Sequence, residues 1–177
     1  MKLRLLVLFL LPLSPLSLRA QLGLYGGFTV QNVGTPWANG NVFYGGTLGA
    51  YLAGKRLSIV NVGGDLRGSF SRDSGDTLNT GAIGPRIGFN LHVIPLHPYA
   101  EATVGLANLH FRGGSNNDTR FEYQILGGLD ITVLPRIDWR IVEYSYGGFS
   151  VPNGDDFHPK TFTTGIVLRL PRVFPMP

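Results

Sequence analysis

Residues 59–70 read IVNVGGDLRGSF, and this stretch decides how the rest of the sequence is interpreted. The even-numbered positions carry apolar side chains or glycine, whereas the odd-numbered positions include Asp65 and Arg67. Such alternation predicts a β-strand with one face in an apolar medium. In a soluble protein the valines would line a core, but in a barrel that spans a membrane they would face lipid and the charges would face the lumen. The strand by itself leaves both alternatives open.

The first twenty residues, MKLRLLVLFLLPLSPLSLRA, have the layout of a secretory signal peptide. Lys2 and Arg4 precede a short apolar run, and Ala20 is a suitable last residue before cleavage. The alternative is a membrane-anchoring helix, but the apolar run is shorter than the roughly 20 residues that a spanning helix needs. The sequence therefore predicts an exported chain: signal peptide 1–20, one barrel domain over 21–170 and a C-terminal tail over 171–177.

Composition excludes several classes of protein. The chain of 177 residues is long enough for one domain, and its lack of cysteine excludes a disulfide framework and a thiolate metal site. The 15 basic residues fall to 12, against 11 acidic ones, once Lys2, Arg4 and Arg19 are removed with the signal peptide. The basic character of the whole chain is therefore no reason to expect nucleic-acid binding.

Eight alternating segments follow the signal peptide, separated by clusters of Gly, Asn, Asp, Ser and Pro. Strands are expected over residues 22–31, 42–53, 57–71, 81–93, 99–111, 121–133, 137–147 and 161–170. The seventh changes phase in its middle, which predicts a β-bulge near Ile141–Val142. The connections alternate between short ones (54–56, 94–98 and 134–136) and longer polar ones (32–41, 72–80, 112–120 and 150–159), as in a transmembrane barrel.

Charged and aromatic residues favour the membrane alternative. The polar faces carry nearly balanced charge, as a narrow lumen requires: Asp65, Glu101, Glu122, Asp130 and Glu143 with Arg67, Arg86, Arg140 and Arg169. The apolar faces carry aromatic residues near the strand ends that adjoin the longer loops, as in an interfacial girdle: Phe28, Tyr44, Phe70, Phe121, Tyr123, Tyr144, Tyr146 and Phe162. Trp139 is expected at the opposite rim.

The last strand reads TFTTGIVLRL, and Thr163, Gly165, Leu168 and Leu170 match the C-terminal signal of outer-membrane barrels. On this strand, the strand count and the loop asymmetry, the mature chain resembles the small eight-stranded outer-membrane barrels of the OmpA type. Leu170 departs from the usual terminal aromatic residue, and PRVFPMP follows it. The resemblance implies a location in the outer membrane of a Gram-negative-type bacterium. Its expected partners are outer-membrane lipid, lipopolysaccharide and, during biogenesis, the barrel assembly machinery.

The expected fold is all-β: an eight-stranded antiparallel up-and-down transmembrane β-barrel preceded by a signal peptide. A barrel of eight strands has an interior just wide enough for side chains, so we expect a lumen plugged by ion pairs. The expected function is a structural or adhesive role through external loops, whose partner the sequence does not identify. A secreted, soluble, lipocalin-like binding barrel is an alternative.

No catalytic, cofactor-binding or metal-binding residues are expected. The histidines, at positions 92, 97, 110 and 158, lack metal-ligand spacing, and no phosphate-binding glycine loop is present. Residues 143–154, EYSYGGFSVPNG, resemble part of the outer-membrane lipid A deacylases, with Ser145 in the place of their nucleophile. Glu143 stands where those enzymes carry the histidine base, and a carboxylate alone activates a serine poorly. The deacylase function is therefore only an alternative to a protein that is not an enzyme.

Overall fold

The computed structural model describes residues 21–33, 42–57, 59–91, 94–110, 117–150 and 156–171. The predicted signal peptide and all but the first residue of the predicted tail lie outside these ranges. The strands are β1 Gln21–Asn32, β2 Val42–Leu57, β3 Val60–Asp73, β4 Asp76–Phe89, β5 Leu96–His110, β6 Asn117–Leu134, β7 Ile137–Ser150, β8 Asp156–Phe157 and β9 Lys160–Arg169. Among the described residues there is no helix long and apolar enough to cross a membrane.

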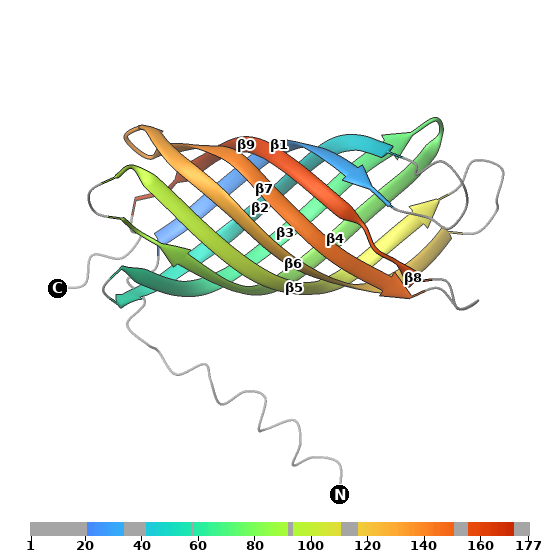
Figure 1. The fold of residues 1–177 in the computed structure, drawn as a ribbon, viewed down its shortest axis with the longest axis horizontal. Helices are drawn as coiled ribbons and strands as arrows, with labels where there is room; N and C mark the ends of the chain where they lie inside the picture. Colours follow the sequence, from blue (N-terminus) through green and yellow to red (C-terminus); the bar gives the residue numbers. More distant parts are fainter. Residues whose placement is uncertain are drawn as a thin grey trace, which may run out of the picture.

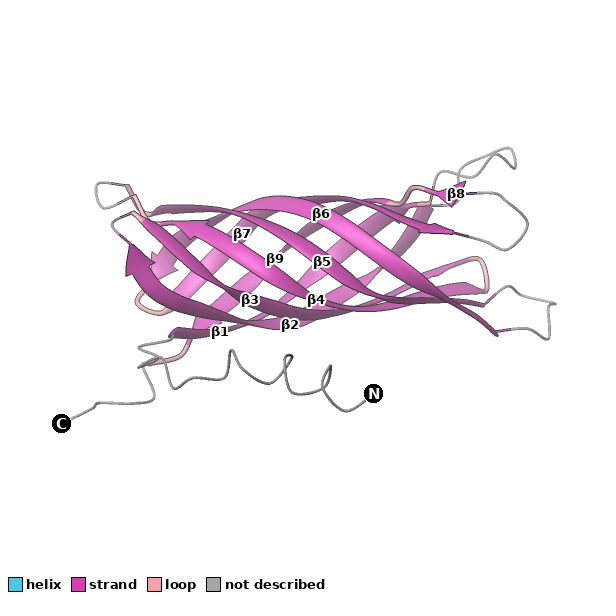
Figure 2. Cartoon of the chain, turned by 90° about the horizontal axis from the view of Figure 1, so that it is seen from below, coloured by secondary structure: helices cyan, strands magenta, loops and turns pink. Residues whose placement is uncertain are grey.

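Eight of these strands close into a barrel (Figures 1 and 2). Neighbouring strands are antiparallel in the order β6-β5-β4-β3-β2-β1-β9-β7, and β6 pairs with β7 to complete the ring. The short β8 pairs only with the end of β7. We call the end where β1 begins and β9 finishes the turn end, and the opposite end the loop end. The predicted all-β, eight-stranded antiparallel barrel is confirmed.

The outer surface of the barrel is apolar, and this answers the question raised by residues 59–70. Leu66 is 59% exposed, whereas its neighbours Asp65 and Arg67 are 2% and 6% exposed. The same alternation runs along every long strand, so that large apolar side chains cover the outside while charged side chains lie within. A soluble lipocalin-like barrel would have the opposite arrangement.

The aromatic residues of the predicted girdle all lie on this outer surface, each at least a third exposed. Tyr144 and Phe162 pack against each other there, with ring centroids 5.0 Å apart. Trp139 is also exposed, and its indole nitrogen donates to Thr164 Oγ1 at 3.4 Å. This is the surface expected of a barrel in contact with lipid and its headgroups.

The predicted bulge lies in β7 at Ile141. Leu129 of β6 faces Val142 and Asp130 faces Arg140, so Ile141 is the additional residue. The bulge keeps Trp139 and Val142 on the outer surface although they are three residues apart. Because of this phase shift, Glu143, three residues after the inward Arg140, also faces the lumen.

One of the predicted long loops is wrong. Residues 72–80 form a hairpin in which β3 continues to Asp73, β4 starts at Asp76, and Ser74 and Gly75 make the turn with positive φ angles of 47° and 106°. The reason is that Leu78 continues the alternation and is fully buried inside the barrel. Asp and Thr favour turns. Burial of Leu78 inside the barrel nevertheless favours pairing of β3 with β4 through these residues, and the turn is limited to Ser74 and Gly75.

Candidate functional site in the barrel lumen

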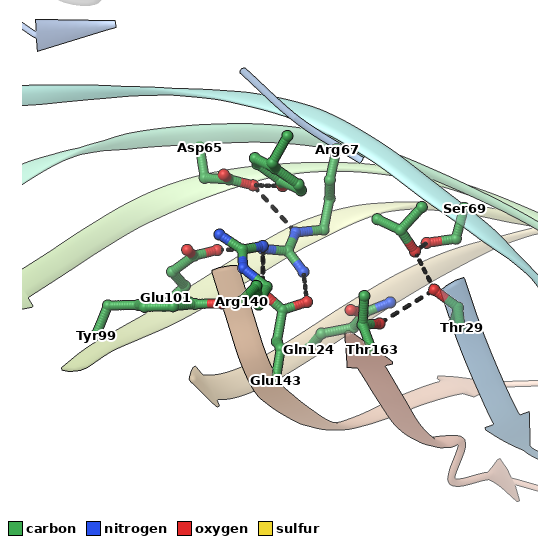
Figure 3. A network of polar contacts seen from close by, with 12 residues as sticks. Thr29, Asp65, Arg67, Ser69, Tyr99, Glu101, Gln124, Arg140, Glu143 and Thr163 are labelled. Carbon is green, nitrogen blue, oxygen red and sulfur yellow. Dashed lines mark hydrogen bonds and ion pairs between the residues drawn. The ribbon is translucent and has the colours of Figure 1, made fainter. Parts of the chain in front are cut away.

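Arg67 is the centre of an ion-pair network that crosses the middle of the lumen (Figure 3). Its Nε lies 3.0 Å from Asp65 Oδ1, its Nη2 2.6 Å from Glu101 Oε2 and its Nη1 2.8 Å from Glu143 Oε1. All four side chains are more than nine-tenths buried. Since buried charges require partners, these contacts explain how one β3 arginine can coexist with three carboxylates in the interior.

Two further arginines extend the network toward the turn end. Arg86 Nη1 lies 2.5 Å from Glu101 Oε1, and its Nη2 lies 3.5 Å from Asp130 Oδ2. Arg140 Nε lies 3.0 Å from Asp130 Oδ1, and its Nη1 lies 2.9 Å from Glu143 Oε2. The bulge at Ile141 brings Arg140 and Glu143, three residues apart, onto the same inward side.

A third group lies at the turn end and was missed in part from the sequence. Arg169 Nη2 pairs with Asp138 Oδ1 and donates to Thr132 Oγ1 at 2.6 Å. Asp138 is 1% exposed. It was not among the lumen charges predicted from the sequence. Its position one residue before Trp139, on the opposite face, is the signal that could have found it. All nine charged residues assigned to the polar faces do line the lumen.

Three buried tyrosines complete the network: Tyr25, Tyr51 and Tyr99. Tyr25 Oη donates to Asp65 Oδ1 at 2.8 Å, and Tyr99 Oη donates to Glu143 Oε2 at 2.6 Å. The guanidinium carbon of Arg86 lies 4.1 Å from the ring centroid of Tyr51 and 3.7 Å from that of Tyr99. The rings therefore hold Arg86 by cation–π contacts in the interior.

Each of these tyrosines lies directly across from an inward glycine on the neighbouring strand. The pairs are Tyr25 with Gly49, Tyr51 with Gly23, and Tyr99 with Gly128. A Cβ atom on any of these glycines would overlap the opposing ring. The glycines therefore make room for aromatic side chains in a narrow interior, a cross-strand pattern that the sequence analysis did not use.

A belt of hydroxyl and amide groups lies between the ion pairs and the loop end (Figure 3). Thr29 Oγ1 lies 2.7 Å from Thr47 Oγ1 and 3.1 Å from Thr163 Oγ1, and Thr47 Oγ1 lies 2.8 Å from Ser69 Oγ. Glu122 is fully buried nearby and accepts a hydrogen bond from the Gln124 amide. The cavity in this belt has a volume of about 10 Å³, which is room for one water molecule.

The loop end of the lumen is filled by apolar side chains, which the sequence analysis did not predict. This apolar cap consists of Val33, Phe43, Leu78, Ala107, Leu109 and Phe149, all less than a tenth exposed. Together with the belt and the ion pairs it fills most of the barrel length. The lumen is therefore not an open pore within the described residues, as expected for eight strands.

The turn end, in contrast, holds an open cavity of about 290 Å³, which we call the vestibule. Its polar lining includes Asn61, Arg86, His97, Asp138 and Arg169, and Tyr51 and Tyr99 form part of its floor. His97 Nε2 lies 2.9 Å from Thr132 Oγ1. The vestibule is much larger than the cavity of the belt, and solvent can enter it.

Within the segment that resembles the lipid A deacylases, Glu143 and Ser145 point into this interior. Ser145 is 4% exposed and lines the small cavity of the belt, and Glu143 is engaged by Arg67, Arg140 and Tyr99. His158, the histidine nearest in sequence, instead stacks on the outward Tyr146 ring, with centroids 5.8 Å apart. The described residues also contain no group of three acidic or histidine side chains arranged to hold a metal ion.

Comparison with known proteins places the fold. No protein-family model matches the sequence, and no curated protein sequence matches it. Solved structures do match, and three of them are matched over 85% of this chain and 99% of theirs. Neisserial surface protein A has a TM-score of 0.63 at 14% identity, and the attachment invasion locus protein Ail of Yersinia pestis has 0.57 at 14%. The outer membrane enzyme PagL has 0.51 at 15%. The chain therefore has the fold of the small eight-stranded outer-membrane β-barrels.

Proposed function

We propose that this protein is an integral outer-membrane barrel that anchors its loop-end connections at the cell surface, where they make structural or adhesive contacts. The observation that carries the proposal is the division of its side chains: apolar outside, with buried ion pairs inside. Such a surface is unfavourable in water and favourable in a bilayer.

The filled lumen supports an anchoring role over transport. A solute entering at the turn end meets the ion pairs of Arg67, Arg86 and Arg140, then the hydroxyl belt and then the apolar cap. Each layer is tightly packed, so passage would require rearrangement of the whole interior. Ion conduction is therefore not part of the proposed function.

An adhesive role is supported by the names of two proteins that share the fold. One is a surface protein of Neisseria, and the other is an attachment invasion locus protein. In this chain the loop-end connections are the parts available for such contacts, since the barrel wall faces lipid. The barrel wall would contact outer-membrane lipid and lipopolysaccharide, and the closing strand would be recognised by the barrel assembly machinery.

The proposal includes export through a signal peptide over residues 1–20 and the absence of enzymatic activity. The inward position of Ser145 supports the second part, because an acyl chain in the bilayer cannot reach it. PagL shares the fold, but at 15% identity this similarity is no evidence that this chain has an enzymatic activity.

The experiment that tests the proposal is expression in a Gram-negative host, followed by fractionation and protease treatment of intact cells. We expect the protein in the outer-membrane fraction, with an N-terminus near residue 21 and gel mobility that changes on heating. Protease should release peptides cut within 112–116 or 151–155, and their removal should lower adhesion of the cells to host-cell surfaces. Recovery in the soluble periplasm would contradict the membrane location, and unchanged adhesion would contradict the adhesive role.

A further inference from the structure

We propose that a groove on the outer surface of the barrel, at the turn end, binds one phospholipid that carries an anionic headgroup. The groove holds an acyl chain beside Trp139, and the headgroup phosphate lies against Arg136. The inference rests on the proposed membrane location and goes beyond it, because an apolar barrel wall by itself requires only unselective contact with lipid.

The groove lies at the outer surface where β7 runs between β6 and β9. We call it the Trp139 groove. It has a volume of about 460 Å³, and its walls include Val133, Ile137, Trp139, Thr164 and Ile166. Val133, Trp139 and Ile166 are each half or more exposed on the outside of the barrel. An occupant therefore comes from the medium around the barrel and not from the lumen.

The polar side chains of the groove are already paired. Trp139 Nε1 donates to Thr164 Oγ1 at 3.4 Å, and the Thr164 hydroxyl donates to the carbonyl oxygen of Arg140 at 2.9 Å. These bonds also hold the indole ring in place as one wall. Because a polar ligand would find no partner in these groups, the groove favours an apolar occupant. The groove is continuous with the lipid-facing wall, and an acyl chain of the bilayer has the matching chemistry.

A cation stands at the turn end of the groove. Arg136 lies in the turn between β6 and β7 and directly precedes Ile137, which lines the groove. Its carbonyl oxygen accepts from Arg169 N at 2.8 Å, which ties the turn to β9. The Arg136 side chain is exposed and forms no ion pair with any described residue. Asp138, the nearest carboxylate in sequence, is buried in the lumen and paired with Arg169.

The spacing of Arg136 and Trp139 suits one lipid molecule. Three residues of β-strand span about 10 Å, and a strand tilt of about 35–45° reduces this to roughly 7–8 Å along the membrane normal. The headgroup region on each side of a bilayer is about 5–8 Å thick. With the indole at the acyl-chain boundary, the guanidinium therefore reaches the level of the phosphates. A phosphate matches the fork of arginine, and basic side chains at this level attract anionic lipid.

The test uses Trp139 as its own reporter. The sequence contains two tryptophans, so Trp37→Phe leaves Trp139 as the only one. This single-tryptophan protein is reconstituted into phosphatidylcholine nanodiscs. A small fraction of the lipid is either phosphatidylglycerol or phosphatidylcholine with brominated acyl chains, which quench indole fluorescence on contact. We expect brominated phosphatidylglycerol to quench Trp139 at lower mole fractions than brominated phosphatidylcholine does, with saturation that fits one bound lipid.

Two variants of the single-tryptophan protein locate the site. Arg136→Gln should reduce the preference for phosphatidylglycerol about fivefold, the effect of one basic side chain at an anionic lipid surface. Val133→Phe fills the groove without changing charge, so quenching should then require the mole fractions expected of random contact. The matched controls are Arg72→Gln and Val62→Phe. Both residues are exposed on the outer surface of β3, away from the groove, and both variants should behave as the parent does.

The outcomes separate failure of the site from failure of the membrane location. Equal quenching by the two brominated lipids in the parent would overturn the proposal, as would unchanged quenching in Val133→Phe. A loss of preference in Arg72→Gln as large as that in Arg136→Gln would also overturn it, because selectivity would then reflect net charge. In discs made wholly of brominated lipid, Trp139 should be quenched in every variant. Absence of quenching there would contradict the membrane location itself.

Discussion

Arg67 and Glu143 are 76 residues apart in the chain and meet inside the barrel, with Nη1 2.8 Å from Oε1. Arg67 is on β3 and Glu143 is on β7, so their contact ties opposite walls together. Both side chains are almost completely buried. The inward charges that alternate along β3 and β7 therefore form an ion pair that holds opposite walls of the closed barrel together.

Replacing Arg67 with glutamine should destabilise the barrel strongly. The change leaves Asp65, Glu101 and Glu143 without their shared partner, and removing one member of a buried ion pair typically costs about 3–5 kcal/mol. The free energy of unfolding, measured by urea titration of the protein in micelles, should fall by this order. Arg72→Gln, on the same strand but exposed, should have little effect. Equal urea midpoints for the two variants would show that the network contributes nothing.

Leu66→Arg should impair membrane assembly far more than Asn79→Arg does. Both side chains are on the outer surface, but Leu66 lies in the middle of β3 and Asn79 lies near the loop end of β4. An arginine at the bilayer midplane costs about 2–4 kcal/mol in such barrels, and much less near the interfaces. The measurement is the folded fraction in outer membranes, judged by heat-dependent gel mobility. Similar yields would contradict a lipid-facing Leu66.

Gly128→Ala should destabilise the protein although alanine is only one methyl group larger. The new Cβ would overlap the Tyr99 ring and displace its hydroxyl from Glu143. Overpacking of this kind typically costs about 1–3 kcal/mol. Gly81→Ala is the control, because its Cβ would point into open space on the outer surface. If both variants have the same urea midpoint of unfolding as the parent, the packing of the Tyr99 ring does not require a glycine at position 128.

Ser145→Ala should leave the lipid A of expressing cells unchanged, as should the parent protein. The reason is geometric: Ser145 faces the lumen, and Glu143 beside it is bound by two arginines. Mass spectrometry of lipid A from cells with and without the protein provides the comparison. Loss of an acyl chain with the parent, but not with Ser145→Ala, would reveal a deacylase.

The strands and the side that each residue faces could be predicted from the sequence because a barrel wall enforces a period of two. The period places Asp65 and Arg67 on one face and Leu66 on the other, and a local phase change is enough to locate the bulge at Ile141. The same pattern identified the inward charges at Glu101 and Asp130. Alternation is a local property, and the sequence contains it directly.

The contents of the lumen could be predicted only in part, since they depend on which strands face each other. Tyr25, Tyr51 and Tyr99 fit inside because glycines stand opposite them, and that relationship requires the strand register. Leu78 of the apolar cap was hidden by the turn-forming residues around it. The pairing of Asp138 with Arg169 depends on the register of β7 and β9, which the bulge shifts.

The central claim, that the apolar faces meet lipid and the charged faces meet each other, can be tested without any substitution. Methyl-labelled protein in lipid nanodiscs allows nuclear Overhauser effects between side-chain methyl groups and lipid acyl chains to be measured. The structure predicts such effects for Val62, Leu66, Ile83 and Ile125, which are exposed on the outer surface. It predicts none for Leu78, Leu126 and Val167, which are buried in the lumen. Acyl-chain contacts from the second group and not from the first would contradict the account.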